Sequence, residues 1–171
     1  MTKQSPVPAD SKPKLDFSSK EYNAVAAGAQ LMAIQQLRLV MDGSPNHYRP
    51  DGRLQLVTQR GLKSCYYEAE SNSVAAIFQY TVTAKAGRAR AFKCVAEYAV
   101  LYEVPKGAPE DAAKAVCAKL GIFAAYPYFR AVAAQMAWNA GLELPPMPTI
   151  AAKPVLGKSK VVAYDEEANG E

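Results

Sequence analysis

The feature that most constrains this chain is a period-two alternation of apolar and polar residues in two neighbouring segments, 74–85 and 90–104. Residues two apart lie on the same face of a strand, so each segment predicts a strand with one apolar face. The residues between them, around Gly87, predict a tight turn, because glycine adopts a positive φ without strain. One covered face and one wet face are typical of antiparallel sheets. The positions expected to point inward are Val74, Ala76, Phe78, Tyr80, Val82, Phe92, Cys94, Ala96, Tyr98, Val100 and Tyr102.

Two further strands are predicted upstream. Residues 62–70 alternate Cys65, Tyr67 and Ala69 against Tyr66, Glu68 and Glu70. Residues 33–42 alternate less cleanly before a stop at Gly43. Residues 43–60 contain two prolines and many polar groups, and we interpret them as a long loop or crossover. The two sides of the first strand are expected to be Ala33, Gln35, Leu37, Leu39 and Met41 against Ile34, Gln36, Arg38, Val40 and Asp42.

Helices are predicted at both ends of this strand region. Ser18 followed by Glu21 matches the capping box that begins a helix, expected to reach about Ala29. Two C-terminal helices are predicted, the first over 109–121 and the second over 127–141. The second has one apolar stripe, made of Phe129, Val132, Ala133, Met136 and Ala140.

The expected fold class is therefore α+β, with a four-stranded antiparallel sheet and two C-terminal helices packed on one face. At 171 residues the chain is the size of one domain, which we place at 17–150. Residues 1–16 are rich in Pro, Lys, Ser and Asp and predict a disordered N-terminal arm, and residues 151–171 predict a flexible C-terminal tail.

Composition and motifs give no support for an enzyme. The net charge is +4 and no block of five or six like charges occurs, which argues against nucleic-acid binding. The three cysteines form no C-x-x-C pair, and we find no phosphate-binding loop or metal-binding motif. We therefore expect no catalytic residue, metal or cofactor. A site built around His47 or Cys65 is the remaining enzymatic alternative. Without an apolar stretch long enough to span a bilayer, the chain is expected to be cytoplasmic.

The segment from Phe123 to Pro148 combines aromatic residues with Met136, Trp138 and Met147. Aromatic residues at the start of a helix are typical of core packing. Aromatics and methionines gathered within about 25 residues are also typical of an adaptable apolar binding surface. Both interpretations remain open from composition.

This segment resembles the SecB export-chaperone family. The resemblance rests on Tyr126-Pro127-Tyr128-Phe129-Arg130, on Gly141, and on the proline-rich exit Leu144-Pro145-Pro146-Met147-Pro148. A second similarity lies in the hairpin Thr81-Val82-Thr83-Ala84 and Ala91-Phe92-Lys93-Cys94. Together with the order of strands and helices, the resemblance covers about residues 30–148.

The resemblance implies an ATP-independent chaperone that holds unfolded client polypeptides and keeps preproteins export-competent. It also implies a homotetramer, built as a dimer of dimers, with no cofactor and no membrane insertion. The client would lie in a long apolar groove. The residues that the resemblance suggests for that groove are Val40, Met41, Tyr126, Phe129, Met136, Leu142 and Leu144.

The expected partner-docking face differs from the family pattern. Family members that deliver clients to the translocation motor use acidic residues on the outer face of the sheet. Of the corresponding positions here, Asp42 keeps an acid, whereas Arg38 and Arg88 are basic. Reversed charges weaken docking on a basic partner. The long helix that follows the proline-rich exit in typical members is also missing. The chain therefore looks closer to the SecB-like chaperones of toxin–antitoxin systems, which bind an antitoxin. A non-catalytic adaptor protein is a further alternative.

Overall fold

The computed structural model describes residues 17–43, 54–149 and 162–164. The predicted N-terminal arm, the loop that contains His47 and most of the predicted tail lie outside the described residues. The elements are α1 (Ser19–Gly28), β1 (Gln30–Gly43), β2 (Gln55–Glu68), β3 (Ser73–Ala86), β4 (Ala89–Glu103), α2 (Glu110–Asn139) and β5 (Val162–Tyr164).

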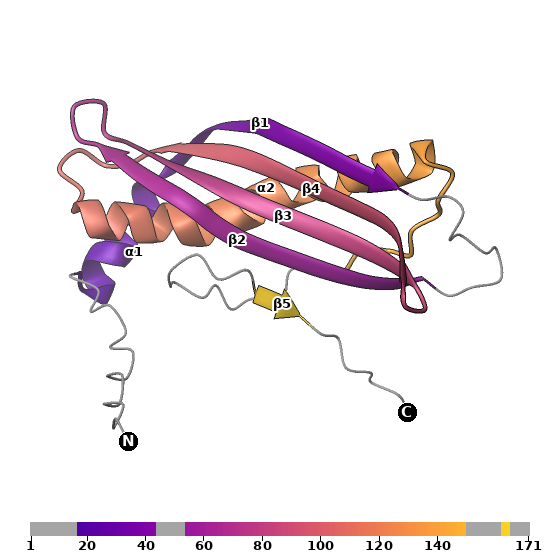
Figure 1. The fold of residues 1–171 in the computed structure, drawn as a ribbon. Coiled ribbons are helices and arrows are strands. Elements are labelled where there is room, and N and C mark those ends of the chain that lie inside the picture. Colours follow the sequence, from indigo (N-terminus) through magenta and orange to yellow (C-terminus); the bar gives the residue numbers. More distant parts are fainter. Residues whose placement is uncertain (1–16, 44–53, 150–161, 165–171) are drawn as a thin grey trace, which may run out of the picture.

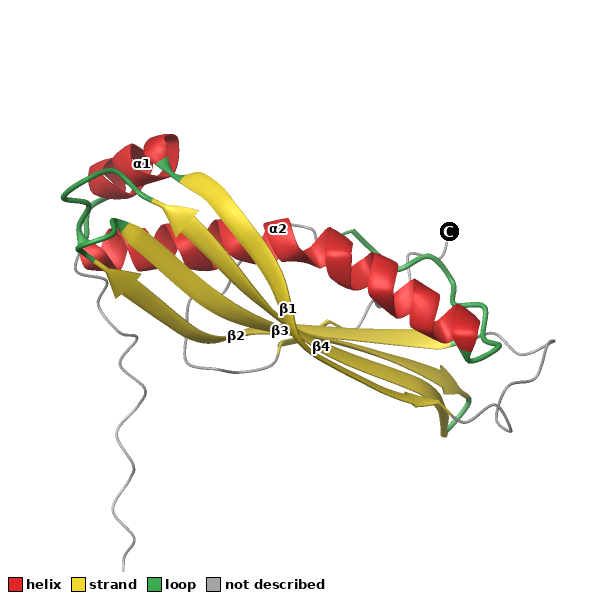
Figure 2. Cartoon of the chain, turned by 90° about the horizontal axis from the view of Figure 1, so that it is seen from above, coloured by secondary structure: helices red, strands yellow, loops and turns green. Residues whose placement is uncertain are grey.

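The strands form one antiparallel sheet in the order β1-β4-β3-β2-β5 (Figure 1). Strands β2, β3 and β4 are joined by consecutive turns, while β1 lies beside β4 and connects to β2 across the width of the sheet. This is a Greek-key order. Helix α2 runs along one face of the sheet, and α1 packs against it at one end (Figure 2). The four long strands and the single helical layer confirm the α+β class, and β5 adds three residues from the predicted tail.

The core lies between the sheet and α2, and the predicted inward positions of β3 and β4 are confirmed. All of them are buried, and Phe78, Tyr80 and Phe92 are completely so. Tyr80 stacks on Phe129 of α2, with 5.3 Å between ring centroids, and touches the ring of Tyr126. Phe129 and Tyr126 are buried, so these two aromatic residues of α2 belong to the core.

The two predicted C-terminal helices are one continuous helix, α2, and the predicted break between them is wrong. The sequence predicts a helix end at Gly121, but this residue lies inside α2. A glycine fits this position because the helix passes very close to the sheet there. A Cβ added to Gly121 would lie 2.6 Å from Cε2 of Phe78. Pro127 also lies inside α2. A proline removes one backbone donor, which kinks a helix without ending it when tertiary contacts compensate. The Tyr80 hydroxyl donates to the Ile122 carbonyl at 2.8 Å, and α2 bends near its middle (Figure 2).

Three β-bulges, two in β1 and one in β2, correct the predicted faces of these strands. Met32 and Leu37 each have no partner in the register with β4, so the strand faces switch after each of them. Gln36 and Leu39 therefore both face α2, although the predicted alternation placed them on opposite sides. Lys63 is the corresponding extra residue in β2. Strand β2 also begins at Gln55, within the predicted loop, because residues 55–60 pair with β3.

The predicted start of α1 and the predicted end of α2 are confirmed. The Ser18 side chain accepts from the Glu21 amide at 3.2 Å, and the Glu21 carboxylate accepts from the Ser18 amide at 2.6 Å. At the other end of the fold, Gly141 has a φ of 73° directly after α2. Its amide bonds to the Trp138 carbonyl, and the next amide, Leu142, bonds to Ala137. This is a Schellman motif, and it reverses the direction of the chain after the helix.

Candidate binding surface

A groove of about 360 Å³ lies between the second half of α2 and the proline-rich exit. The Schellman motif sends the exit back along the helix, and two contacts hold it there. Leu142 and Met147 are buried against the core, and the Tyr126 hydroxyl donates to the Pro148 carbonyl at 2.7 Å. The exit is therefore fixed at both ends, with the groove between. Its lining is mostly apolar and consists of Pro127, Arg130, Ala131, Ala134, Leu144, Pro145, Pro146 and Met147.

A second apolar surface lies on β1, the edge strand of the sheet. Every residue of β1 is at least partly exposed, and five of its large apolar side chains expose 41–56% of their surface. Edge strands of soluble proteins usually carry charges that prevent pairing with other chains. An apolar edge strand of 14 residues is therefore typical of an interaction surface. The exposed residues are Leu31, Met32, Leu37, Val40 and Met41.

The structure divides the predicted groove residues into two groups. Tyr126, Phe129 and Leu142 are 7%, 0% and 1% exposed, so they lie in the core and present no surface to a client. Met136 and Leu144 are half-buried, and Leu144 lines the groove beside α2. Val40 and Met41 are exposed on β1, but they lie on opposite faces of the sheet, because Val40 pairs with Val95 and Met41 with Cys94. The structure therefore does not bring the seven residues together in one groove.

Residues outside the predicted set contribute more to these surfaces. Pro127, Ala131, Ala134 and Pro146 line the groove. Trp138 and Tyr128 are 71% and 55% exposed on the outer side of α2. The proline-rich exit was recognised in the sequence as a motif. The alanines were not assigned to a groove, since small residues at helical spacing are equally typical of a stripe that packs on a sheet.

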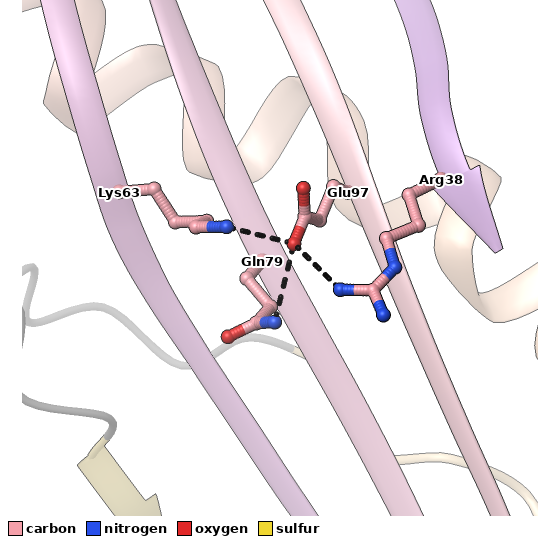
Figure 3. A network of polar contacts seen from close by, with 4 residues as sticks. All are labelled: Arg38, Lys63, Gln79 and Glu97. Carbon is pink, nitrogen blue, oxygen red and sulfur yellow. Dashed lines mark hydrogen bonds and ion pairs between the residues drawn. The ribbon is translucent and has the colours of Figure 1, made fainter. Parts of the chain in front are cut away.

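The outer face of the sheet, away from α2, carries a polar row that crosses all four long strands (Figure 3). Glu97 of β4 is only 9% exposed, although it lies on the outer face. Its carboxylate accepts from the Lys63 ammonium at 2.9 Å and from the Gln79 amide at 3.4 Å, and Arg38 lies 3.7 Å away. The bulge at Lys63 breaks the register of β2 at this level. The long side chains of Lys63 and Arg38 cover the carboxylate and neutralise it.

The three predicted docking residues lie apart on this side of the sheet. Arg38 belongs to the polar row with Glu97. Asp42, near the end of β1, forms an exposed ion pair with Arg90. Arg88 is exposed in the β3–β4 turn, next to Gly87, whose φ is 61°. The only acid among them is thus already paired with an arginine, which reduces its availability to a basic partner.

The described residues give little material for catalysis. Among them, no group of three or more His, Cys, Asp or Glu side chains is arranged to hold a metal ion. Burial raises the pKa of Cys94 to about 11, so its thiol stays protonated at neutral pH. The alternative site around His47 or Cys65 stays a prediction, because His47 lies outside the described residues. In the described part of the chain, no helix has the length and apolar character that crossing a bilayer requires.

The comparison with solved structures supports the fold. No protein-family model matches the chain, and no curated protein matches it in sequence. Among solved structures, the chain is similar to the Mycobacterium tuberculosis SecB-like chaperone Rv1957 in complex with a ChAD peptide from the Rv1956 HigA1 antitoxin. The TM-score is 0.66 at 19% identity, and the match covers 80% of this chain and 100% of Rv1957. The SecB-like fold expected from the sequence is therefore confirmed.

Proposed function

We propose that this chain, which has the SecB-like fold, is an ATP-independent chaperone that holds unfolded polypeptides. The observation that carries the proposal is the apolar surface that the protomer leaves exposed on β1 and beside α2. Exposing Met32, Leu37 and Trp138 does not stabilise a single domain. Full burial of such side chains lowers the free energy by roughly 1.5–3 kcal/mol each. A partner that covers them gains that free energy.

The chemistry of the surface favours an extended, apolar client. The groove beside α2 is lined by prolines, alanines, Leu144 and Met147, with Arg130 as its charged member. Such a lining offers few directional hydrogen bonds, so it selects for exposed apolar area more than for one sequence. Binding of this kind needs no nucleotide hydrolysis, because a holdase acts by taking the unfolded chain out of the aggregation equilibrium. We further propose that the protein is not an enzyme and acts in the cytoplasm.

We assign the two apolar surfaces different roles. The backbone of an edge strand forms a continuous ladder with a second strand, so β1 is suited to pairing with β1 of another copy. The groove beside α2 is then the client site. Pairing through β1 generates a dimer, and association of two dimers generates the homotetramer expected for this fold. Sedimentation of Leu37→Lys tests the assignment, because a charge on the β1 edge should reduce the mass of the assembly.

A dedicated antitoxin client is the second candidate, and two observations favour it. The similar structure, Rv1957, was solved with a peptide from an antitoxin. The outer face of this chain presents Arg38, Lys63 and Arg88 where a basic translocation motor would require acids. We therefore favour an antitoxin over general preproteins as the client, and delivery to the translocation motor is the weaker alternative.

Aggregation of a denatured model protein, followed by light scattering, tests the proposal. The wild-type chain should suppress aggregation at a stoichiometric ratio without ATP. Ala134→Glu should reduce suppression several-fold, because a carboxylate in an apolar groove must be desolvated before a client can cover it. The matched control is Gln135→Glu, which adds the same charge to the next residue of α2, outside the groove lining.

Three outcomes separate the alternatives. Equal loss in both variants would show that charge on α2, and not the groove, controls binding. No suppression by the wild type would refute the holdase. Binding to one folded protein that unrelated unfolded peptides do not displace would indicate an adaptor.

A further inference from the structure

Two of the three cysteines lie close together where β2 packs on α2. Cys65 is on the inner face of β2, opposite Ala76, and Cys117 is buried on α2. The two side chains interact, since each is the largest cause of the change in the pKa of the other. The surrounding contacts place both sulfurs in the same layer. The Cys65 sulfur lies 3.9 Å from the Lys114 carbonyl of α2, and the Cys117 sulfur lies 3.8 Å from the Val74 carbonyl of β3.

The two thiols differ in exposure and in charge environment. Cys65 is half-buried, so a small molecule from solvent reaches it more readily than Cys117, which is fully buried. The neighbouring Cys117 side chain and, to a smaller extent, the Lys114 ammonium lower the pKa of the Cys65 thiol, against the opposing effect of burial. The Cys65 side chain and burial raise the pKa of Cys117 above its usual range. A thiolate is the nucleophilic form of cysteine, so Cys65 is the reactive member of the pair.

We propose that Cys65 and Cys117 form a reversible disulfide in response to a peroxide. The Cys65 thiolate attacks one oxygen of the peroxide, the O–O bond breaks, and a sulfenic acid remains on Cys65. The departing hydroxide takes a proton and leaves as water. The Cys117 sulfur then attacks the Cys65 sulfur, forming the S–S bond and breaking the S–O bond. The second hydroxide leaves as water with the Cys117 proton. The sulfur pair loses two electrons and the peroxide gains them, and a dithiol reductant reverses the change by exchange.

The bond joins β2 to the first half of α2, whereas the client groove lies along the second half. It closes a chain segment of about 50 residues, from strand to helix. Closing a loop of this length reduces the entropy of the unfolded chain, and a rise in melting temperature on the order of 5–10 °C is expected. The oxidised protein should therefore be a more stable chaperone with an unchanged groove. This inference stands independently of the proposed function.

Intact mass and peptide mapping of the full-length chain test the proposal. After treatment with hydrogen peroxide, the wild type should lose about 2 Da, for two hydrogen atoms, and mapping should join Cys65 to Cys117. Cys94→Ser is the matched control and should behave as the wild type. Cys65→Ser should show no loss of mass, and Cys117→Ser should retain a sulfenic acid on Cys65 that a dimedone probe labels.

The results that would overturn the proposal are equally direct. The proposal is wrong if all three thiols of the wild type remain free after peroxide treatment, or if the disulfide joins two chains. It is also wrong if dimedone labels Cys94 in place of Cys65. The mapping of the wild type decides the matter even if Cys117→Ser, a substitution in the core, fails to fold.

Discussion

Replacing Gly121 by alanine sets two effects of opposite sign against each other. In an exposed helix the change stabilises by roughly 0.5–1 kcal/mol, because alanine loses less backbone entropy than glycine on folding. In α2, however, the new Cβ would lie 2.6 Å and 2.9 Å from two ring carbons of Phe78 and 3.5 Å from Cβ of Val100. Phe78 is completely buried, and its ring is covered by neighbours on every side, so it has little room to move away.

The magnitude follows from these distances. Overpacking a tight core costs roughly 1–3 kcal/mol, and the helix must shift away from the sheet to relieve two contacts below 3 Å. Subtracting the gain in helix propensity leaves a net loss of about 1–2 kcal/mol. For a domain of this size the melting temperature should fall by about 2–8 °C.

Thermal unfolding at one fixed protein concentration measures the effect, because the melting temperature of a protein that self-associates depends on concentration. Gly61→Ala is the matched control, because a Cβ there meets no atom within 4 Å. It should be neutral or slightly stabilising. A double mutant that adds Phe78→Leu should recover part of the loss, as expected for two residues in contact. A Gly121→Ala protein at least as stable as the wild type would refute the close approach of α2 to β3.

Two other substitutions probe polar contacts. Tyr80→Phe removes the hydroxyl that donates to the Ile122 carbonyl, and the free energy of unfolding in chemical denaturation should fall by about 1–2 kcal/mol. Tyr66→Phe, on the exposed surface, should leave it unchanged. Equal effects of the two substitutions would contradict the role of this bond. Glu21→Gln tests the capping box through pH. Hydrogen bonds from the Ser18 backbone and side chain lower the pKa of Glu21, so its contribution is present above the usual carboxyl pKa and is lost as pH falls through the lowered value. Because glutamine caps without titrating, the stability of the wild type relative to the variant should decrease as the pH is lowered through that range. Melting temperatures that differ by the same amount at every pH would exclude this role of the Glu21 carboxylate.

Local sequence patterns predicted the structure correctly where a single local rule determines it. The alternation of β3 and β4 gave the correct inward residues because both are central strands with one covered face. The capping box at Ser18 and the glycine after α2 each depend on residues a few positions apart. These features need no knowledge of the rest of the fold.

The errors arose where tertiary contacts outweighed a local rule. Gly121 and Pro127 are typical of helix boundaries, but Gly121 allows close packing on Phe78, and Pro127 lies inside the continuous helix α2. The bulges at Leu37 and Lys63 change the face of every later residue in their strands, and no local signal marks them. The first part of β2 places Thr58 and Arg60 toward the helix side, so it shows no apolar alternation.

The same limit applies to the binding surface. The aromatic residues of the Tyr-Pro-Tyr motif led to the prediction of a groove. In the structure, the ring of Tyr126 packs in the core, and its hydroxyl donates to the exit segment. The groove is lined instead by the small residues that the same helix turns outward, and their role depends on where the chain goes after Gly141.

The two edges of the sheet differ in a way that limits the addition of strands from further copies of the chain. Beyond β2, the three residues of β5 occupy positions 58–60, while within the described part of the chain no strand lies beside β1. A sheet with two free borders can add copies without end, which is how fibres form. If β1 pairs with β1 of a second copy, as proposed above, the joined sheet holds two copies, and β5 covers part of each of its outer borders. The short strand contributed by the C-terminal segment would in this way hinder the addition of further strands and keep the sheet from polymerising.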